Sequence, residues 1–300
     1  MSLSIGSLAF DTIENVHGRR ERIVGGSLTY YAYAASLFEK PKLVGVIGED
    51  FPEAIINEMK ERGIDVRGIE KEEGKTFFWE GKYSDDFLER ETITTELNVF
   101  EHFDPKIPDF YKGERNVFLA NIAPSLQKKV MEQLGEDKFY VMDTMNLWIN
   151  IDRAGLEDVI RKVDGIILND EEARMLTEKS YIYDAAKALK NYGISFALIK
   201  KGENGSMLYY DNKFVVIPPY PIETVIDPTG AGDSYGGAFM GFLEEAGNID
   251  LKTLKKAMVY GTIVSSFTIE DFGVERLRNL KREDVEQRLG EYMEMLNFSV

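Results

Sequence analysis

The segment IDPTGAGDSYGGAF, from Ile226 to Phe239, decides the fold of this chain. It gathers four glycines, at positions 230, 232, 236 and 237, around the acid Asp233. Glycine inside a helix or strand costs stability, so such a cluster calls for a steric or functional reason. Three interpretations compete: a dinucleotide-binding turn, a serine nucleophile elbow, and an anion-binding helix start that carries a catalytic aspartate.

The first interpretation fails on the spacing of the glycines, and the second fails because no histidine follows the serine. A dinucleotide-binding turn needs G-x-G-x-x-G after the first strand of a βαβ unit, whereas these glycines are spaced G-x-G-x-x-x-G late in the chain. The stretch GDSYG (232–236) matches the elbow motif G-x-S-x-G, but the histidine of that fold must follow the serine. The two histidines of the chain, His17 and His102, both precede it.

The third interpretation fits the helical pattern that follows the glycines, SYGGAFMGFLEE (234–245). Free N–H groups at a helix start bind anions, and glycines let phosphate oxygens approach the backbone. The same groups can stabilise charge that develops on a transferring phosphoryl group. Asp233 in the first turn is then placed to accept a proton from an attacking hydroxyl. Taken alone, Asp233 is equally well explained as a capping acid.

Composition limits the partners of the chain. Fifty-two acidic against 36 basic residues give a net charge of -16, which repels polyanions. We therefore expect no nucleic acid and no anionic membrane as partner. The absence of cysteine excludes disulfides, thiolate zinc sites and thiol nucleophiles. No signal peptide is visible and no apolar run approaches the roughly 18 residues of a membrane span, so the sequence predicts a soluble, cytoplasmic protein.

Strand and helix patterns alternate along most of the chain, and its 300 residues suffice for one large domain, 1–300. Apolar strands that alternate with helices predict an α/β fold, a parallel sheet covered on both faces. A hairpin is expected at 206–218, with its turn at Asp211 and Asn212, and the last third is helical except near 270–277. The expected strands are 4–10, 42–48, 116–121, 139–144, 165–169 and 196–202, and the expected helices are 27–40, 51–63, 125–134, 170–176 and 185–192.

Three segments depart from this alternation: 19–26, 74–83 and 90–100. Each alternates β-forming and polar residues, which predicts antiparallel strands with one solvated face, outside the main sheet. We interpret them as a small β lid built from about 11–24 and 70–100. Edge strands without a lid function are the alternative.

Four motifs in the same order resemble those of one family. DPTGAGDSYGGAFMGFL (227–243) resembles the C-terminal signature of the ribokinase-like, or PfkB-type, carbohydrate kinases, and GGSLTYYAYAASLF (25–38) resembles their N-terminal Gly-Gly signature. NDEEARML (169–176) is similar to their N-x-x-E segment, and KKGENG (200–205) to their Gly-bracketed strand end. Because order and spacing agree over nearly the whole chain, it is identified as a member of this family.

The resemblance implies a three-layer αβα fold with a mainly parallel central sheet and a small β lid over the sugar. It also implies transfer of the γ-phosphoryl group of ATP to an alcohol, with Mg²⁺. Asn169 and Glu172 would then organise Mg²⁺ through water, although in isolation they indicate only a helix cap and a first-turn charge. By position, Asp233 would be the base, Gly230, Ala231 and Gly232 the anion hole, and Lys200, Gly202, Gly205, Thr229 and Asn169 the nucleotide-binding residues.

On the acceptor side, the resemblance implies that Asp11, after the first strand, grips substrate hydroxyls. Gly25 and Gly26 would let the substrate approach the backbone. The family usually has Asn a few residues later, where this chain has Tyr30 followed by Tyr31. A phenol is larger and its ring can stack, which argues against plain ribose and is compatible with another sugar, a cyclitol or a nucleoside.

We therefore predict an ATP- and Mg²⁺-dependent sugar kinase with Asp233 as base, and a nucleoside kinase on the same scaffold as the alternative. The lid aromatics Phe77, Phe78 and Trp79 are expected to cover the acceptor, and a homodimer through the lid is a further expectation. A binding protein without catalysis is disfavoured because Asp233 and the N-x-x-E segment are intact.

Overall fold

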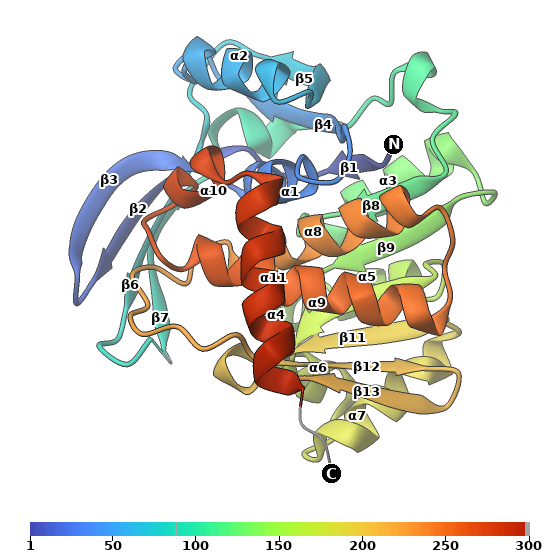
Figure 1. The fold of residues 1–300 in the computed structure, drawn as a ribbon. Helices are drawn as coiled ribbons and strands as arrows, with labels where there is room; N and C mark the ends of the chain where they lie inside the picture. Colours follow the sequence, from blue (N-terminus) through green and yellow to red (C-terminus); the bar gives the residue numbers. More distant parts are fainter. Residues whose placement is uncertain (88, 298–300) are drawn as a thin grey trace.

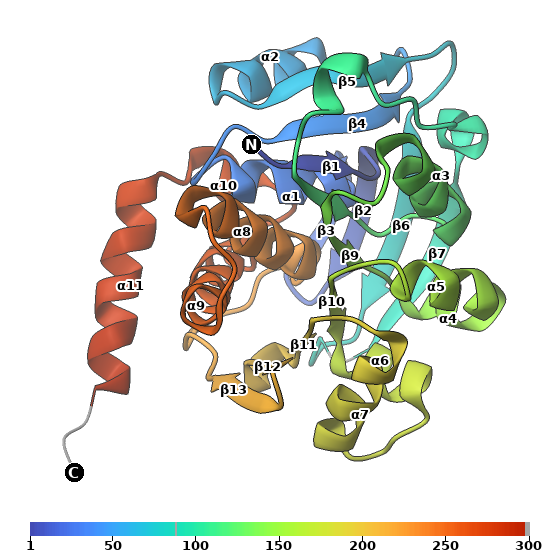
Figure 2. The same cartoon turned by 90° about the vertical axis from the view of Figure 1, so that its right-hand side faces the viewer.

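The computed structural model describes residues 1–87 and 89–297, and Figures 1 and 2 show a large sheet flanked by helices and a smaller sheet that projects from it. Within the described residues the large sheet has nine strands in the order β13-β12-β11-β10-β9-β8-β1-β4-β5. All neighbours from β11 to β5 are parallel, and β12 and β13 are antiparallel additions. Its strands are β1 (Leu3–Ile5), β4 (Lys42–Ile47), β5 (Asp65–Lys71), β8 (Asn116–Leu119), β9 (Phe139–Asp143), β10 (Gly165–Asn169), β11 (Phe196–Lys200), β12 (Ser206–Tyr210) and β13 (Lys213–Ile217).

Helices cover both faces of this sheet, as the edge-on view in Figure 2 shows. The strands read as apolar runs because alternate residues face opposite layers: Val117 and Leu119 contribute to one core and Phe118 to the other. One face carries α1 (Ser27–Ala35), α2 (Glu53–Glu61), α8 (Ala231–Ala246), α9 (Leu251–Thr268), α10 (Glu275–Asn279) and α11 (Arg282–Leu296). The other carries α3 (Pro124–Leu134), α4 (Asn146–Ile151), α5 (Arg153–Ile160), α6 (Asp170–Thr177) and α7 (Ile182–Leu189). The predicted three-layer αβα architecture is confirmed.

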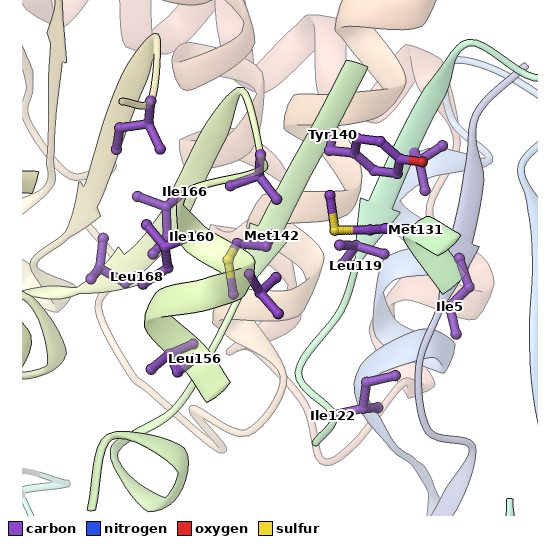
Figure 3. Close-up of a cluster of buried hydrophobic side chains, with 14 of the residues drawn as sticks. Ile5, Leu119, Ile122, Met131, Tyr140, Met142, Leu156, Ile160, Ile166 and Leu168 are labelled. Atoms are coloured by element: carbon purple, nitrogen blue, oxygen red, sulfur yellow. The ribbon is translucent and has the colours of Figure 1, made fainter. Parts of the chain in front are cut away.

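Figure 3 shows part of the core between the sheet and the helices α3 and α5. Met142 and Ile166, from neighbouring strands, meet Leu156 and Ile160 of α5 there, and all four are completely buried. Burial of a side chain of this size stabilises a fold by about 1.5–3 kcal/mol. This layer holds the strand ends in register, so the polar residues that follow them keep fixed positions.

The smaller sheet has the order β3-β2-β6-β7. Its outer pairs, β2–β3 and β6–β7, are antiparallel, but the central pair β2–β6 is parallel, so the expectation of an entirely antiparallel lid is wrong. The chain enters this sheet twice, and each entry supplies one antiparallel hairpin. Its strands are β2 (Ala9–Asn15), β3 (Gly18–Gly25), β6 (Phe77–Tyr83) and β7 (Arg90–Glu96).

The predicted strand 4–10 is in fact two strands in two sheets. β1 pairs with β4 and β8 in the large sheet, and after a bend at 6–8 the chain continues as β2 in the small one. The bend is anchored by α1, because the Leu28 N–H donates to the Ser7 carbonyl at 2.9 Å and the Ser7 and Ser27 hydroxyls lie 3.2 Å apart. Asp11 consequently lies within a strand of the small sheet, not after the first strand of the large one.

Other boundaries differ from the sequence predictions in smaller ways. β5 was not predicted, and its last two residues, 70 and 71, were assigned to the lid although they belong to the large sheet. α4 and α5 were also missed. The hairpin of β12 and β13 is confirmed, with positive φ at Asp211 (49°) and Asn212 (57°) in its turn. No helix among the described residues is long and apolar enough to cross a membrane.

Candidate active site

Three neighbouring strands of the large sheet end in polar residues that lie together. β9 ends at Asp143, β10 at Asn169 and β11 at Lys200, and Asn169 is paired with Lys200 across the sheet. The Lys200 Nζ lies 3.4 Å from the Asp143 Oδ2. Ligands of open α/β sheets bind beyond the carboxyl ends of the strands. Asp143 was missed by sequence reasoning, although its place at the end of a predicted strand was a usable signal.

Lys200 also reaches the start of α8. A β-carbon built on Gly232 would lie 2.8 Å from the Lys200 Nζ, and only 17% of the lysine side chain is exposed. Although burial acts to lower the pKa of Lys200, Asp143, Glu172 and Asp233 raise it above its usual range. Lys200 is therefore an enclosed cation among carboxylates and not a solvated surface charge.

Asp233 lies in the first turn of α8. Burial raises the pKa of its carboxyl group to about 7 and Asp143 adds to the shift, while Lys200 and Arg90 act in the opposite direction. A carboxylate with a pKa near neutrality matches the requirement for a general base at physiological pH. The sequence placed Asp233 at this helix start, and the structure adds the electrostatic surroundings.

Gly230 is the N-cap residue directly before α8, with a φ of 75° that favours glycine. A β-carbon on Gly230 would also overlap the ring of Tyr30. The Ala231 N–H donates to the Pro228 carbonyl at 3.2 Å, so one of the three predicted anion-hole residues already has a partner within the turn. An anion at this helix start would use the N–H groups that follow, beginning with Gly232.

The loop before α8 is fixed by Asp227, a completely buried residue that sequence reasoning did not single out. Its carboxylate accepts from the Thr229 N–H at 2.9 Å and from the Gly273 N–H at 3.0 Å. The Thr229 hydroxyl in turn lies 2.9 Å from the hydroxyl of Tyr83, which belongs to the small sheet. Thr229 therefore connects the small sheet to the helix that carries Asp233.

Asn169 and Glu172 form a capping box at the start of α6. The Asn169 N–H donates to the Glu172 carboxylate at 2.7 Å, and the Glu172 N–H donates to the Asn169 Oδ1 at 2.8 Å. Burial raises the pKa of Glu172 to about 7, although Lys200 opposes the shift. Asn169 and Glu172 thus form the helix cap that their sequence indicates in isolation. Glu172 also lies near Lys200, at the edge of the site.

The oxygen ligands at this edge fit Mg²⁺. Glu172, Asn169 and Asp143 offer carboxylate and amide oxygens, the donors that this ion prefers. No group of three or more Asp, Glu, His or Cys side chains forms a metal cage in the described part of the chain. Mg²⁺ bound with nucleotides needs no such cage, because one or two carboxylates, water and phosphates complete its shell.

Gly202 and Gly205 bracket a short 3-10 turn between β11 and β12. Both have positive φ, and no described atom lies within 4 Å of a β-carbon built on Gly202. Gly202 therefore faces open space two residues beyond Lys200. Their predicted role beside the nucleotide stays a prediction.

On the other side of the site, Asp11 is 4% exposed and lies against the backbone of Gly25, where a β-carbon would overlap its carboxylate. Burial raises the pKa of Asp11 to about 7, and Asp227 and Asp233 add to the shift, while a hydrogen bond from the Gly26 backbone opposes it. The structure thus brings the predicted acceptor residues Asp11, Gly25 and Gly26 together.

Tyr30 is 1% exposed, and no described residue hydrogen-bonds to its hydroxyl group. Burial raises the pKa of its phenol well above the usual range, and Asp11, Asp227, Tyr83 and Asp233 add to the shift. The ring lies against Gly230, at the start of the helix that carries Asp233. Buried hydroxyls rarely lack a partner, so this one is a candidate ligand contact.

Around Asp11 the small sheet presents an apolar cluster. Asp11 is flanked by Ile23 on β3 and Trp79 on β6, its partners in the strand register. Of the three predicted lid aromatics only Trp79 belongs to this cluster, because Phe77 stacks on Phe100 at 5.5 Å and Phe78 lies beneath Arg22 at 5.9 Å. The small-sheet cluster comprises Ile13, Tyr83 and Phe272, with the partly exposed Ile23, Trp79, Phe87 and Ile226 around them.

Comparison with known proteins identifies the family of the chain. The family model described as pfkB family carbohydrate kinase matches residues 2–279. The chain belongs to the pfkB family. It is therefore a phosphotransferase that acts on a hydroxyl group of a sugar or a nucleoside, as the motifs predicted.

The relatives and solved structures that the chain resembles are named as nucleoside and sugar kinases. A cytidine kinase from Thermococcus kodakarensis is 30% identical over 243 residues, which cover 79% of this chain and 86% of that protein. A nucleoside kinase from Methanocaldococcus jannaschii superposes with a TM-score of 0.78 at 22% identity, covering 97% of this chain and 98% of the other. A putative ribokinase II from E. coli in complex with ATP and Mg²⁺ gives 0.79 at 17% identity, covering 97% and 99%. These two structures share the fold.

Proposed function

We propose that this pfkB-family kinase transfers the γ-phosphoryl group of ATP to a ribose hydroxyl of a nucleoside, with Mg²⁺. The observation that carries the proposal is the small-sheet cluster beside Asp11. Its partly exposed members offer an apolar, aromatic wall directly next to the carboxylate that would hold hydroxyl groups. A bare pentose has little surface for such a wall, whereas a nucleobase has a flat face that stacks on aromatic side chains.

Asp233 acts as the base in this mechanism. Its carboxylate takes the proton of the acceptor hydroxyl as the oxygen forms a bond to the γ-phosphorus. The bond between that phosphorus and the bridging oxygen breaks, and ADP leaves with the electron pair. The raised pKa of Asp233 makes the carboxylate basic enough for this proton transfer at neutral pH.

The start of α8 and Lys200 would stabilise the negative charge on the phosphoryl group during its transfer. The Gly232 N–H and the enclosed Lys200 ammonium group lie at one place, where they can contact oxygens of the transferring group. Glu172, with Asn169, would hold Mg²⁺ through water, and the ion would neutralise part of the triphosphate charge. Thr229, Gly202 and Gly205 would complete the nucleotide side.

Asp11 would position the acceptor. Its carboxylate can accept hydrogen bonds from two neighbouring hydroxyl groups, and Gly25 leaves room for it beside the backbone. The unpartnered Tyr30 hydroxyl would donate to the same ligand. The identity to a cytidine kinase supports a nucleoside acceptor, and the family description supports a carbohydrate.

A screen for ADP release over nucleosides, sugars and cyclitols tests the proposal. We expect at least one nucleoside to give the highest kcat/KM, with the phosphorylated hydroxyl identified by ³¹P NMR of the product. A sugar or cyclitol that exceeds every nucleoside would contradict the nucleoside proposal and leave the family assignment intact.

Homodimerisation through the small sheet and the lack of affinity for nucleic acid also stay predictions. The outer strands β3 and β7 are largely exposed, so they are the edges at which a second copy would pair. Sedimentation equilibrium tests the homodimer, and a DNA-binding titration at low salt tests the lack of affinity for nucleic acid.

A further inference from the structure

Arg90 is the first residue of β7 and lies opposite Tyr83 in the small sheet. Tyr83 contacts Thr229, so this end of β7 lies beside the loop that leads into α8. No sequence motif includes Arg90. Its side chain is exposed, and no ion pair holds its guanidinium group within the described part of the chain.

The guanidinium group of Arg90 rests on Trp79, 5.5 Å from the centre of the indole ring, and it lies near the Tyr83 hydroxyl group, where it opposes the rise in the pKa of that phenol. The indole lies flat across Gly81, where a β-carbon would overlap it, and its N–H donates to the Thr92 hydroxyl at 3.3 Å. Trp79 is thus held in one orientation. A cation on a partly exposed aromatic face is bound only weakly, so another ligand of that face can displace it.

The same Trp79 borders the acceptor site, because it is the register partner of Asp11. A nucleobase stacked on this wall and the Arg90 guanidinium group would therefore compete for one indole face. Displaced from Trp79, the guanidinium group is close to a site whose carboxylates would attract it.

The charge of Arg90 already reaches both sides of the site. Burial raises the pKa of Asp11, Asp233 and Glu172, and Arg90 acts against this rise at all three carboxyl groups. These three residues lie on the acceptor side, at the base and on the metal side respectively. The geometry agrees with this reach, because Arg90 is the register partner of Tyr83, whose hydroxyl group lies 2.9 Å from the Thr229 hydroxyl in the loop before α8.

We propose that Arg90 has two positions: on Trp79 while the acceptor pocket is empty, and on the transferring phosphoryl group once a nucleobase occupies that wall. The guanidinium group then contacts phosphoryl oxygens from the small sheet while Lys200 contacts them from the large one. Arginine suits this role because its donors match phosphate oxygens in pairs. The arrangement couples acceptor binding to catalysis and leaves ATP without this cation when no acceptor is bound.

The test uses Arg90→Ala in the full chain. The chain has two tryptophans, so a Trp148→Phe background leaves Trp79 as the only tryptophan in the sequence. Removing Arg90 should lower kcat by about 10²–10³-fold, as expected for the loss of one donor to developing charge. It should also tighten binding of the acceptor nucleoside alone, measured by Trp79 fluorescence, by about two- to fivefold, because the competing cation is gone. A structural role alone would not improve binding.

Lys82→Ala is the matched control, since it removes one positive charge from the same sheet at the neighbour of Tyr83, where Lys82 is paired with Glu14. It should change neither quantity. A kcat of Arg90→Ala within twofold of the parent overturns the phosphoryl contact, and weaker nucleoside binding overturns the competition for Trp79.

The proposal rests on the nucleoside acceptor in one respect, the displacement from Trp79. If the screen finds a sugar as the best acceptor, the proposed function fails and the displacement fails with it. The kcat of Arg90→Ala with that sugar then decides the phosphoryl contact by itself, so the two failures are distinguished.

Discussion

The ring of Tyr30 lies directly against Gly230, so closely that a β-carbon on this glycine would overlap the phenol. Tyr30 belongs to α1, which follows the glycine pair of the acceptor side, and Gly230 begins the helix that carries Asp233. Two segments separated by 200 positions are therefore in contact at the centre of the site. A change in either residue is expected to affect the other.

Gly230→Ala should lower kcat by about 10²–10³-fold, because the new methyl group must displace Tyr30 or the turn that presents the Gly232 N–H. Positive φ adds a cost of about 1–2 kcal/mol in stability. Gly247→Ala is the control: φ is 68° at the other end of the same helix, and no described atom lies near its β-carbon. Equal loss of kcat in both variants would show that helix strain, not the contact with Tyr30, is responsible.

Tyr30→Phe should lower kcat/KM for the acceptor about 5–30-fold, an effect of ~1–2 kcal/mol, if the hydroxyl group donates to that ligand. It should not lower the melting temperature, because the hydroxyl group has no partner among the described residues. Tyr31→Phe should have the opposite effects: it should lower the melting temperature and leave kcat/KM for the acceptor unchanged. The Tyr31 hydroxyl contacts the Ser2 hydroxyl at 3.0 Å, away from the site. Unchanged acceptor kinetics in Tyr30→Phe would place the phenol outside the acceptor site.

Activity should be lost as the pH falls through about 7. Asp233 works in its ionised form, and its pKa is raised to about 7, so the ionised fraction declines below that pH. Asp11 and Glu172 titrate in the same range, which makes the decline steeper than for a single proton. The pH profile of kcat/KM measures this effect.

Asp233→Asn should reduce kcat about 10²–10⁴-fold at every pH and remove the contribution of this group to the acidic limb. Asp250→Asn, which changes the capping acid of the neighbouring helix α9, should leave the profile unchanged. An acidic limb that survives unaltered in Asp233→Asn would assign it to other carboxyl groups.

Glu172→Gln should raise the Mg²⁺ concentration for half-maximal activity about 10–100-fold, the range for loss of a group that orients a metal shell. Glutamine keeps an oxygen that can accept the Asn169 N–H, so the cap at the start of α6 is retained. Glu171→Gln is the control, because it changes an exposed acid in the same turn. Activity should vanish with EDTA and return with excess Mg²⁺; EDTA-resistant activity would reject the role of the ion.

The sequence allowed most of the layers to be predicted because the buried strands are continuous apolar runs separated by amphipathic helices. It concealed the break at 6–8 for the same reason: the residues on both sides are equally buried, and only the pairing partners differ. β5 was missed because an edge strand with alternating polar residues resembles a loop.

The residues of the candidate site fall into two groups, those that local sequence motifs reveal and those that only folding brings together. Residues inside contiguous motifs, such as Asp233 and Asn169, could be named in advance because local patterns carry them. Arg90 could not, since it reaches the site through strand pairing that arises only on folding. Asp143 had a local signal, its place at the end of a predicted strand, but only the strand order brings it beside Lys200. The enclosure of Lys200 is also a tertiary property, and no local signal separated it from a surface lysine.

Because of the bend at 6–8, the residues that would hold the acceptor and the phosphoryl group belong to different sheets. Asp11, which would hold the acceptor, belongs to the small sheet, whereas Lys200 ends a strand of the large sheet. The gap between the attacking oxygen and phosphorus is thus set by the tilt of one sheet on the other. A rotation of one sheet against the other would change this gap without any change of rotamer at Asp11 or Lys200, so the backbone orientation would control the distance between the reacting atoms.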